Sequence, residues 1–171
     1  MKTRELFITA FMLLLIITLG YVWISPASQT APDLNLSTAT GSQIQIGSKQ
    51  TKVVLINLWA TSCTSCIKEI PHLSKLYQEL NPQGLEVVGI SMYYDPPVQV
   101  MEMVKRKPVP YPVVFDLDKK IIHAFGIKNP ITPTTLLISP KGKIVYRKVG
   151  LPDMQYLRKL IKPMLDNQKK G

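Results

Sequence analysis

The sequence predicts an α/β fold with a mixed central sheet and helices on both faces. Apolar runs typical of buried strands alternate along the chain with segments of helical periodicity. Near the C-terminus, Thr134–Ser139 and Lys143–Val149 are strand-like and are separated only by turn residues 140–142, which predicts an antiparallel hairpin. The only two cysteines, Cys63 and Cys66, follow a continuous apolar run and precede a helical segment, so they lie at a predicted strand–helix junction.

The first predicted elements lead into and out of this junction. Ile44–Ile46 alternates apolar and polar residues and predicts a short edge strand. Val53–Leu58 is apolar apart from one asparagine, which is typical of a strand buried on both faces. From Thr64 to Leu80 the apolar residues recur at helical spacing, and Pro71 is expected to kink this helix.

The middle of the chain repeats the same alternation. Turn residues at 81–84 end the helix and lead to a second buried strand, Leu85–Met92. A helix is predicted over 95–107, because an aspartate and two prolines mark its start. Val113–Phe115 is then a short apolar strand, and Lys119–Phe125 is a short helix closed by a glycine.

The last predicted element is an amphipathic helix from Asp153 to Asn167, which Pro163 is expected to kink or end early. Strands and helices in alternation, followed by a hairpin and a helix, are typical of a parallel sheet extended by antiparallel strands. Residues 34–171 therefore predict one globular domain.

The N-terminus predicts that this domain is exported. Leu6–Ile24 is an apolar run without a charge, and a membrane-spanning helix needs about 20 such residues. Lys2 and Arg4 precede the run, so the positive-inside rule predicts a cytoplasmic segment over 1–5 and a transmembrane signal anchor over 6–24.

The residues after the predicted anchor are small and polar and include prolines, so 25–33 are expected to be a tether rather than part of the domain. The alternative to a retained anchor is a signal peptide cleaved near Ser25–Ala27. Both interpretations place residues 34–171 outside the cytoplasm.

The net charge is +10, from 21 basic and 11 acidic residues spread over helix ends and turns. We interpret this excess as a solvated basic surface that can be drawn towards anionic lipid head groups. No binding to nucleic acid is expected, because the chain shows no motif of basic and aromatic residues and an exported domain rarely meets nucleic acid.

The spacing Cys63-x-x-Cys66 favours thiol–disulfide exchange. At a helix start, the first thiol lies among free backbone N–H groups and at the positive end of the helix dipole. Both features favour the thiolate, which is the attacking species in exchange.

Other uses of the two cysteines remain open alternatives. A purely structural disulfide would close too short a loop to stabilise much. A closed zinc site needs four ligands, and the chain adds only His72 and His123, which are not at ligand spacing. A peroxidatic cysteine would follow a threonine by three residues, whereas Thr61 is two residues before Cys63.

Residues around the cysteines match a known pattern. Trp59-Ala60 precedes the pair, Pro71 follows it, and Thr132-Pro133-Thr134 precedes the hairpin. Longer matching stretches occupy 54–61, 66–71, 87–91 and 133–145. With these motifs, nearly all of 34–171 resembles the membrane-anchored TlpA/ResA/CcmG-like branch of the thioredoxin-fold proteins. The motifs are specific for fold and dithiol chemistry and much less so for substrate.

The resemblance implies roles for individual residues. Cys63 would be the exposed nucleophile and Cys66 the buried resolving thiol, together forming the redox-active disulfide. Pro133 would be a cis-proline facing the cysteines, so that the backbone of Thr132 can hold an extended substrate strand. Trp59 would pack beside the thiols and the substrate.

Asn57 and Glu69 concern proton transfer. Asn57 stands where thioredoxin has a buried aspartate that helps proton transfer, so the resemblance moves this role to another residue. Glu69 is the candidate, because it lies three residues after Cys66 on the same helix face and the branch often carries an acid there. The alternatives are that Glu69 is only a solvated helix residue and that Asn57 only satisfies buried backbone groups.

Two departures from the family pattern leave the reduction potential open. Thr64-Ser65 replaces the usual proline-containing pair between the cysteines, and Ser62 stands where a tryptophan often precedes the first cysteine. The residues between the cysteines tune the stability of the thiolate.

Together these observations predict an envelope thiol–disulfide oxidoreductase held in the membrane by one helix. By resemblance it would reduce disulfides in exported proteins, including apocytochrome c, take electrons from a membrane thiol transporter of the DsbD/CcdA type, and need no bound cofactor. Two alternatives are a disulfide oxidant or isomerase, and a non-enzymatic thiol metallochaperone or redox-sensing module.

Overall fold

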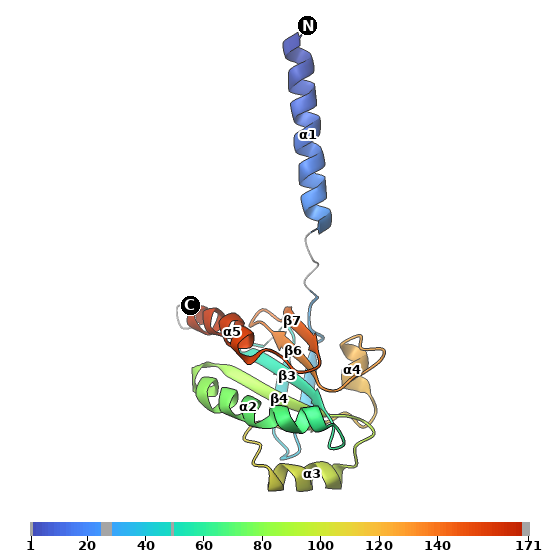
Figure 1. The fold of residues 1–171 in the computed structure, drawn as a ribbon, viewed down its shortest axis with the longest axis vertical. Helices are drawn as coiled ribbons and strands as arrows, with labels where there is room; N and C mark the ends of the chain where they lie inside the picture. The colour runs from blue at the N-terminus through green and yellow to red at the C-terminus, as the bar shows by residue number, and fades with distance from the viewer. Residues whose placement is uncertain (1, 25–28, 49, 169–171) are drawn as a thin grey trace.

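The computed structural model describes residues 2–24, 29–48 and 50–168. The alternative cleavage site at 25–27 and the first part of the expected tether lie outside the described residues. Apart from the N-terminal helix α1 (Lys2–Ile24), the described elements gather around one sheet (Figure 1).

A five-stranded sheet with the order β5-β4-β3-β6-β7 forms the centre of the domain. β3 pairs in parallel with β4 and antiparallel with β6, so the predicted mixed sheet is confirmed. The strands are β3 (Val53–Trp59), β4 (Leu85–Ser91), β5 (Val113–Phe115), β6 (Thr134–Ile138) and β7 (Ile144–Val149). The parallel strands end at one edge of the sheet, and β6 starts at that edge because Thr134 pairs with Leu58.

Helices cover both faces of the sheet, as predicted. They are α2 (Thr64–Leu80), α3 (Pro97–Arg106), α4 (Lys120–Ala124) and α5 (Met154–Gln168). Side chains at alternate positions of β3 point to opposite faces. Leu55 accordingly packs with leucines of α2 and α5, whereas Ile56 packs with residues of α4.

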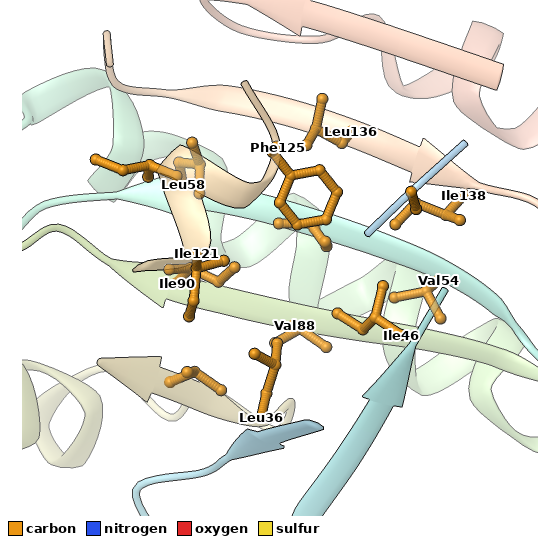
Figure 2. Packing of buried hydrophobic residues seen from close by; sticks show 14 of the residues in the cluster. Leu36, Ile46, Val54, Leu58, Val88, Ile90, Ile121, Phe125, Leu136 and Ile138 are labelled. Carbon is orange, nitrogen blue, oxygen red and sulfur yellow. The ribbon is translucent and has the colours of Figure 1, made fainter. Parts of the chain in front are cut away.

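Figure 2 shows the core on the α4 side, where aliphatic side chains of β3, β4 and β6 meet Ile121 and Phe125. These side chains are almost entirely withdrawn from water. Burial of a side chain of this size contributes on the order of 1.5–3 kcal/mol, so the core holds the end of β3 in place for the residues that follow it.

The helix starts and ends agree with the sequence-based boundaries to within two residues. The expected early end of the last helix was wrong, because α5 continues through Pro163 to Gln168. An internal proline removes one backbone hydrogen bond. Here Leu157, Ile161 and Leu165 are buried on both sides of Pro163 and keep the helix on the sheet.

A β-hairpin precedes the main sheet, and only its second strand was predicted. β1 (Leu34–Ser37) pairs antiparallel with β2 (Gln43–Ile46). The hairpin adjoins the outer edge of β5, where the N–H of Ala39 donates to the carbonyl of Val113 at 2.7 Å. Leu36 and Ile46 are buried in the α4-side core, so this hairpin completes one face of the domain.

The segment just before the hairpin is attached to the sheet as well. The N–H of Ala31 donates to the carbonyl of Gly142 at 2.7 Å, and the N–H of Ile144 donates to the carbonyl of Gln29 at 2.8 Å. Ala31 is buried. Residues 29–31 of the expected tether therefore pack against the domain, while the exact domain boundary stays a prediction.

α1 is one continuous helix over the residues predicted as the anchor, and described apolar side chains such as Phe7 and Phe11 are exposed. Among the described residues, no helix is both long enough and apolar enough to qualify as a membrane span. The signal anchor stays a prediction.

Candidate active site

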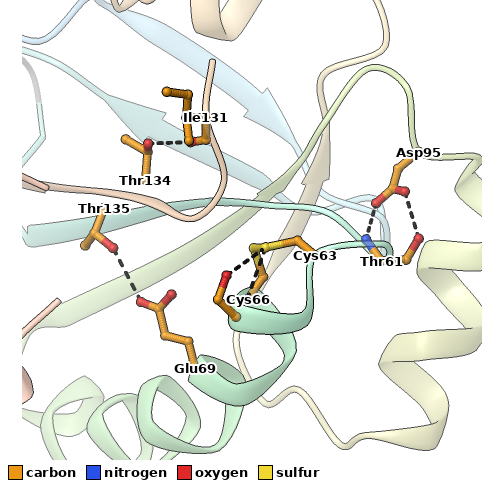
Figure 3. Close-up of a disulfide and its surroundings, with 9 residues drawn as sticks. Thr61, Cys63, Cys66, Glu69, Asp95, Ile131, Thr134 and Thr135 are labelled. Carbon is orange, nitrogen blue, oxygen red and sulfur yellow. Dashed lines mark hydrogen bonds between the residues drawn. A yellow bond between two sulfur atoms is a disulfide. The ribbon is translucent and has the colours of Figure 1, made fainter. Parts of the chain in front are cut away.

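The cysteines lie where β3 passes into α2, as predicted. Cys63 is the N-cap residue of α2, and its sulfur forms a disulfide with Cys66, with an S–S distance of 2.04 Å (Figure 3). The Cys63 Sγ accepts a hydrogen bond from the backbone N–H of Cys66 at 3.2 Å and lies 3.4 Å from the hydroxyl of Ser65. The first sulfur is therefore at the positive end of the helix.

The two sulfurs differ in their access to solvent. Cys66 is 1% exposed and lies inside the first turn of α2, whereas Cys63 is only partly buried. A partner disulfide can therefore reach Cys63 more easily than Cys66. This difference supports the predicted roles of attacking and resolving thiol, which stay predictions.

Trp59 packs beside the cysteines, as the resemblance implied. It is buried in one cluster with Cys66 and Ile70, and the partly buried Cys63 contacts the same cluster. On the neighbouring strand β4, a side-chain carbon added to Gly89 would lie 3.2 Å from the indole nitrogen of Trp59. The glycine thus leaves room for the ring, and this packing fixes the base of the cysteine loop.

Glu69 lies inside the protein, so the interpretation as a solvated helix residue was wrong. The residue is 2% exposed, and its carboxyl faces the sheet from α2. Oε1 accepts a hydrogen bond from the hydroxyl of Thr135 at 3.4 Å (Figure 3). Burial raises the pKa of Glu69 to about 7, while interactions with Asn57 and Thr135 lower it by less.

Three of the buried polar atoms that lack a hydrogen-bond partner among the described residues belong to residues of this site: Asn57 Nδ2, Trp59 Nε1 and Glu69 Oε2. Asn57 lies close enough to Glu69 to lower its pKa, but at the positions in the structure its amide makes no hydrogen bond to Oε2. The carboxyl is thus weakly solvated by the protein. A group with a pKa near 7 can both accept and donate a proton at neutral pH.

Thr132 and Pro133 lie at the same edge of the sheet as the cysteines. The bond between them is cis, as expected. The carbonyl of Pro133 accepts a hydrogen bond from the N–H of Gly150 at 2.8 Å, and β6 begins at the next residue. Contacts of Thr132, Pro133 and Trp59 with a substrate stay predictions.

Asp95 is a residue that sequence reasoning missed. It was interpreted only as part of a helix start, yet its carboxylate accepts two hydrogen bonds from Thr61, in the loop before Cys63 (Figure 3). The available signal was an acidic residue a few positions after a buried strand, because ends of neighbouring parallel strands meet at one sheet edge.

The two histidines are not brought into this site. His72 on α2 and His123 on α4 are both exposed. Within the described residues, no three or more histidine, cysteine, aspartate and glutamate side chains are grouped so that they could hold a metal ion.

A mixed sheet with a Cys-x-x-Cys disulfide at the start of the helix after its central strand defines a thiol–disulfide oxidoreductase of the thioredoxin fold. Comparison with known proteins confirms this class. The chain belongs to the AhpC/TSA family, whose model matches residues 27–147.

Its relatives include thiol–disulfide oxidoreductases named ResA. The protein from Bacillus subtilis is 35% identical over 155 residues, covering 84% of each chain. The protein from Halalkalibacterium halodurans is 34% identical over 140 residues, covering 80% of this chain and 78% of the relative.

Solved structures agree with the fold. A Neisseria meningitidis protein described as a thioredoxin superposes with a TM-score of 0.73 at 31% identity, covering 84% of this chain and 95% of that chain. A Chlorobium tepidum protein described as thiol:disulfide interchange protein DsbE gives a TM-score of 0.71 at 26% identity, covering 81% and 96%. The chain is a thiol–disulfide oxidoreductase of this ResA/DsbE type, with Cys63 and Cys66 as its redox-active pair.

Proposed function

We propose that this oxidoreductase works as a reductant and transfers electrons from its dithiol to disulfides of exported proteins, with apocytochrome c as one substrate. The observation that carries the direction is the polar surroundings of the Cys63 sulfur. Its hydrogen-bonding neighbours are the N–H of Cys66 and the hydroxyl of Ser65. Over residues 50–168 no lysine, arginine or histidine side chain donates a hydrogen bond to it.

Strong disulfide oxidants stabilise the thiolate of the first cysteine, and with it the reduced form. Here only a helix end and one hydroxyl assist the thiolate. A weakly stabilised thiolate favours the disulfide form of the enzyme, which means that the dithiol readily gives up its electrons.

The proposed reaction conserves electrons and protons. The Cys63 thiolate attacks one sulfur of the substrate disulfide and forms a mixed disulfide, and the other substrate sulfur leaves as a thiolate and takes up a proton. Cys66 then loses its proton, attacks Cys63 and releases the second substrate thiol. The substrate gains two electrons and two protons, and the Cys63–Cys66 pair is oxidised.

Glu69 is positioned to accept the proton of Cys66. The two residues are three positions apart on α2 and so lie on the same helix face. Asn57 cannot titrate, and the carboxyl of Glu69 has a pKa of about 7. A membrane thiol transporter of the DsbD/CcdA type would return the dithiol to its reduced form.

The proposal also assigns the predicted anchor a role. The uncharged run over 6–24, with Lys2 and Arg4 before it, would keep the domain at the outer face of the cytoplasmic membrane, close to the transporter. The protein should then stay with the membrane through washes with high salt and alkaline carbonate, and a reporter fused after Gly171 should be active only outside the cytoplasm. Release by high salt alone would contradict the anchor.

The direction is tested by redox equilibration of the full chain against glutathione or dithiothreitol. We expect a potential nearer the thioredoxin value of about −270 mV than the strong-oxidant value of about −120 mV. A potential above about −180 mV, near that of a disulfide isomerase, would contradict the reductant proposal and favour an oxidant or isomerase.

A further inference from the structure

Asp95 is a buried carboxylate joined to the loop that carries Cys63. It follows β4 and is 4% exposed. Its Oδ2 accepts a hydrogen bond from the backbone N–H of Thr61 at 2.6 Å, and its Oδ1 accepts one from the Thr61 hydroxyl at 2.7 Å (Figure 3). Both carboxylate oxygens therefore bind the same residue, two positions before Cys63.

Backbone hydrogen bonds tie the same two segments together. The N–H of Met92 donates to the carbonyl of Trp59 at 3.1 Å, and the N–H of Asp95 donates to the carbonyl of Met92 at 2.9 Å. The N–H of Cys63 in turn donates to the carbonyl of Ala60 at 3.1 Å. The loop that delivers Cys63 is thus held at both ends, and the side chain of Asp95 adds two hydrogen bonds to this arrangement.

The charge of Asp95 has no ionic partner in the part of the chain that the structure describes. The ion pairs found there join other residues, for example Lys52 to Glu86 and Arg158 to Glu79. Two hydrogen bonds from Thr61 are its polar contacts. Because Thr61 and Cys63 are two residues apart, the reach of the chain places this negative charge no more than roughly 14 Å from the Cys63 sulfur.

A buried negative charge at that distance acts against a second negative charge. At the effective dielectric constant typical of proteins, the interaction amounts to about one pKa unit. It disfavours the Cys63 thiolate and therefore the reduced form of the pair. The dithiol becomes a stronger electron donor as a result.

Other ionisable groups also belong to this end of the domain. Glu69 on α2 lies behind Cys66. Lys119, just before α4, has its Nζ 4.1 Å from the centre of the Tyr93 ring, and Tyr93 and Cys63 pack against the same core cluster. Tyr94 is partly exposed in the loop that contains Asp95. A test of Asp95 must keep these groups unchanged.

We propose that Asp95, which is hydrogen-bonded to the Cys63 loop through Thr61, makes the dithiol more strongly reducing by its buried charge. This inference deepens the proposed function but does not depend on the direction of exchange. The potential of the wild type tests the direction, whereas the ratio between variant and wild type tests Asp95.

The test is the pH dependence of the equilibrium with glutathione. In this equilibrium two glutathione thiols give two electrons and two protons to the Cys63–Cys66 disulfide and leave as glutathione disulfide. The full chain in mild detergent is compared with Asp95→Asn, which keeps an acceptor for Thr61 but has no charge. We divide the equilibrium constant of the variant by that of the wild type. The effects of glutathione ionisation and Glu69 ionisation are common to both measurements and cancel in this ratio.

For Asp95→Asn we expect a smaller ratio at about pH 6 than at about pH 9, because the charge of Asp95 acts only on the ionised form of Cys63. At about pH 9 the ratio should approach tenfold in favour of the dithiol, which is about 30 mV for this two-electron couple. The rate of Cys63 alkylation should show the matching fall in the pKa of its thiol. Asp95→Ser, which is also uncharged, should give the same dependence of the ratio on pH. Agreement between the two variants would show that the effect does not come from a folding defect in one of them.

Two matched controls separate charge from loop geometry. Thr61→Val removes one hydrogen bond and keeps the charge, and Asp116→Asn neutralises another buried carboxylate, which accepts hydrogen bonds from the N–H groups of Ile121 and Ile122. Both should stay within about twofold of wild type at both pH values. Two results would overturn the proposal. One is a variant-to-wild-type ratio for Asp95→Asn that does not change with pH or lies below one. The other is the same pH profile for Thr61→Val as for Asp95→Asn.

Discussion

The hydroxyl of Thr135 on β6 donates a hydrogen bond of 3.4 Å to Oε1 of Glu69 on α2, in the interior of the protein. The bond joins two elements that are far apart in the sequence. It offsets only part of the cost of burying the carboxyl, because Glu69 Oε2 has no partner among the described residues and the pKa is raised to about 7. Two predictions rest on this group.

Glu69 should make the oxidised protein less stable as the pH rises. Below about pH 4.5, the ordinary pKa of the group, the carboxyl is protonated in both the folded and the unfolded chain and carries no penalty. Between that pH and about 7 only the unfolded chain ionises, so the free energy of unfolding falls. The full loss is about 3 kcal/mol and is complete above the raised pKa.

Glu69→Gln mimics the protonated acid. Its free energy of unfolding relative to wild type should therefore rise by up to about 3 kcal/mol between about pH 5 and about pH 8.5. Urea unfolding with the disulfide intact measures this difference. Glu102→Gln, at an exposed carboxyl on α3, is the control and should show no comparable gain. Parallel pH profiles for Glu69→Gln and wild type would show that the carboxyl ionises freely in the folded protein.

Glu69 should also shape the pH dependence of exchange. If its carboxylate accepts the Cys66 proton, the wild-type rate of mixed-disulfide resolution should rise as the pH passes about 7. Glu69→Gln should lose this inflection and resolve the mixed disulfide about 10²–10⁴-fold more slowly above that pH, the range typical of general base catalysis. Stopped-flow reduction of a model disulfide gives both rates; an unchanged profile would remove Glu69 from proton transfer.

The cysteines should behave differently on reduction. Cys63 is partly exposed at the helix start and Cys66 is buried, so alkylation at neutral pH should label Cys63 at least about tenfold faster. Peptide mass spectrometry of the reduced protein after short alkylation measures this ratio. Cys63→Ser should abolish exchange, and Cys66→Ser should accumulate mixed disulfides with substrate. Equal labelling of both thiols would contradict the assignment of Cys63 as the attacking thiol.

Gly89 should not tolerate a side chain. A Cβ at this position would lie 3.1 Å from Cε2 of Tyr111 and 3.2 Å from Nε1 of Trp59, and both rings are buried. Gly89→Ala should therefore cost about 1–3 kcal/mol through overpacking. Chemical denaturation measures the cost; a variant as stable as wild type would mean that the rings of Tyr111 and Trp59 can shift to make room.

The local patterns of the sequence were sufficient for most of the elements. Apolar runs predicted β3 and β4, and helical spacing predicted α2 with the cysteines at its start. β1 was missed, because Leu34–Ser37 is only four residues long and becomes a strand through its pairing with β2. The expected early end of the last helix at Pro163 was wrong for a similar reason, since buried side chains on both sides hold α5 on the sheet.

The sequence by itself determined the chemistry: two cysteines at helix spacing behind a buried strand, an acid one turn further along the same helix, and a Thr132-Pro133 pair before the hairpin. Only the tertiary structure decided the environment of these groups. In the interior, Glu69 is hydrogen-bonded to Thr135, 66 residues away, and the loop of Cys63 is held by Asp95, 34 residues from Thr61. Spacing along the chain sets which backbone conformation a segment prefers, but desolvation and charge act between side chains that come together only when strand order and register are in place.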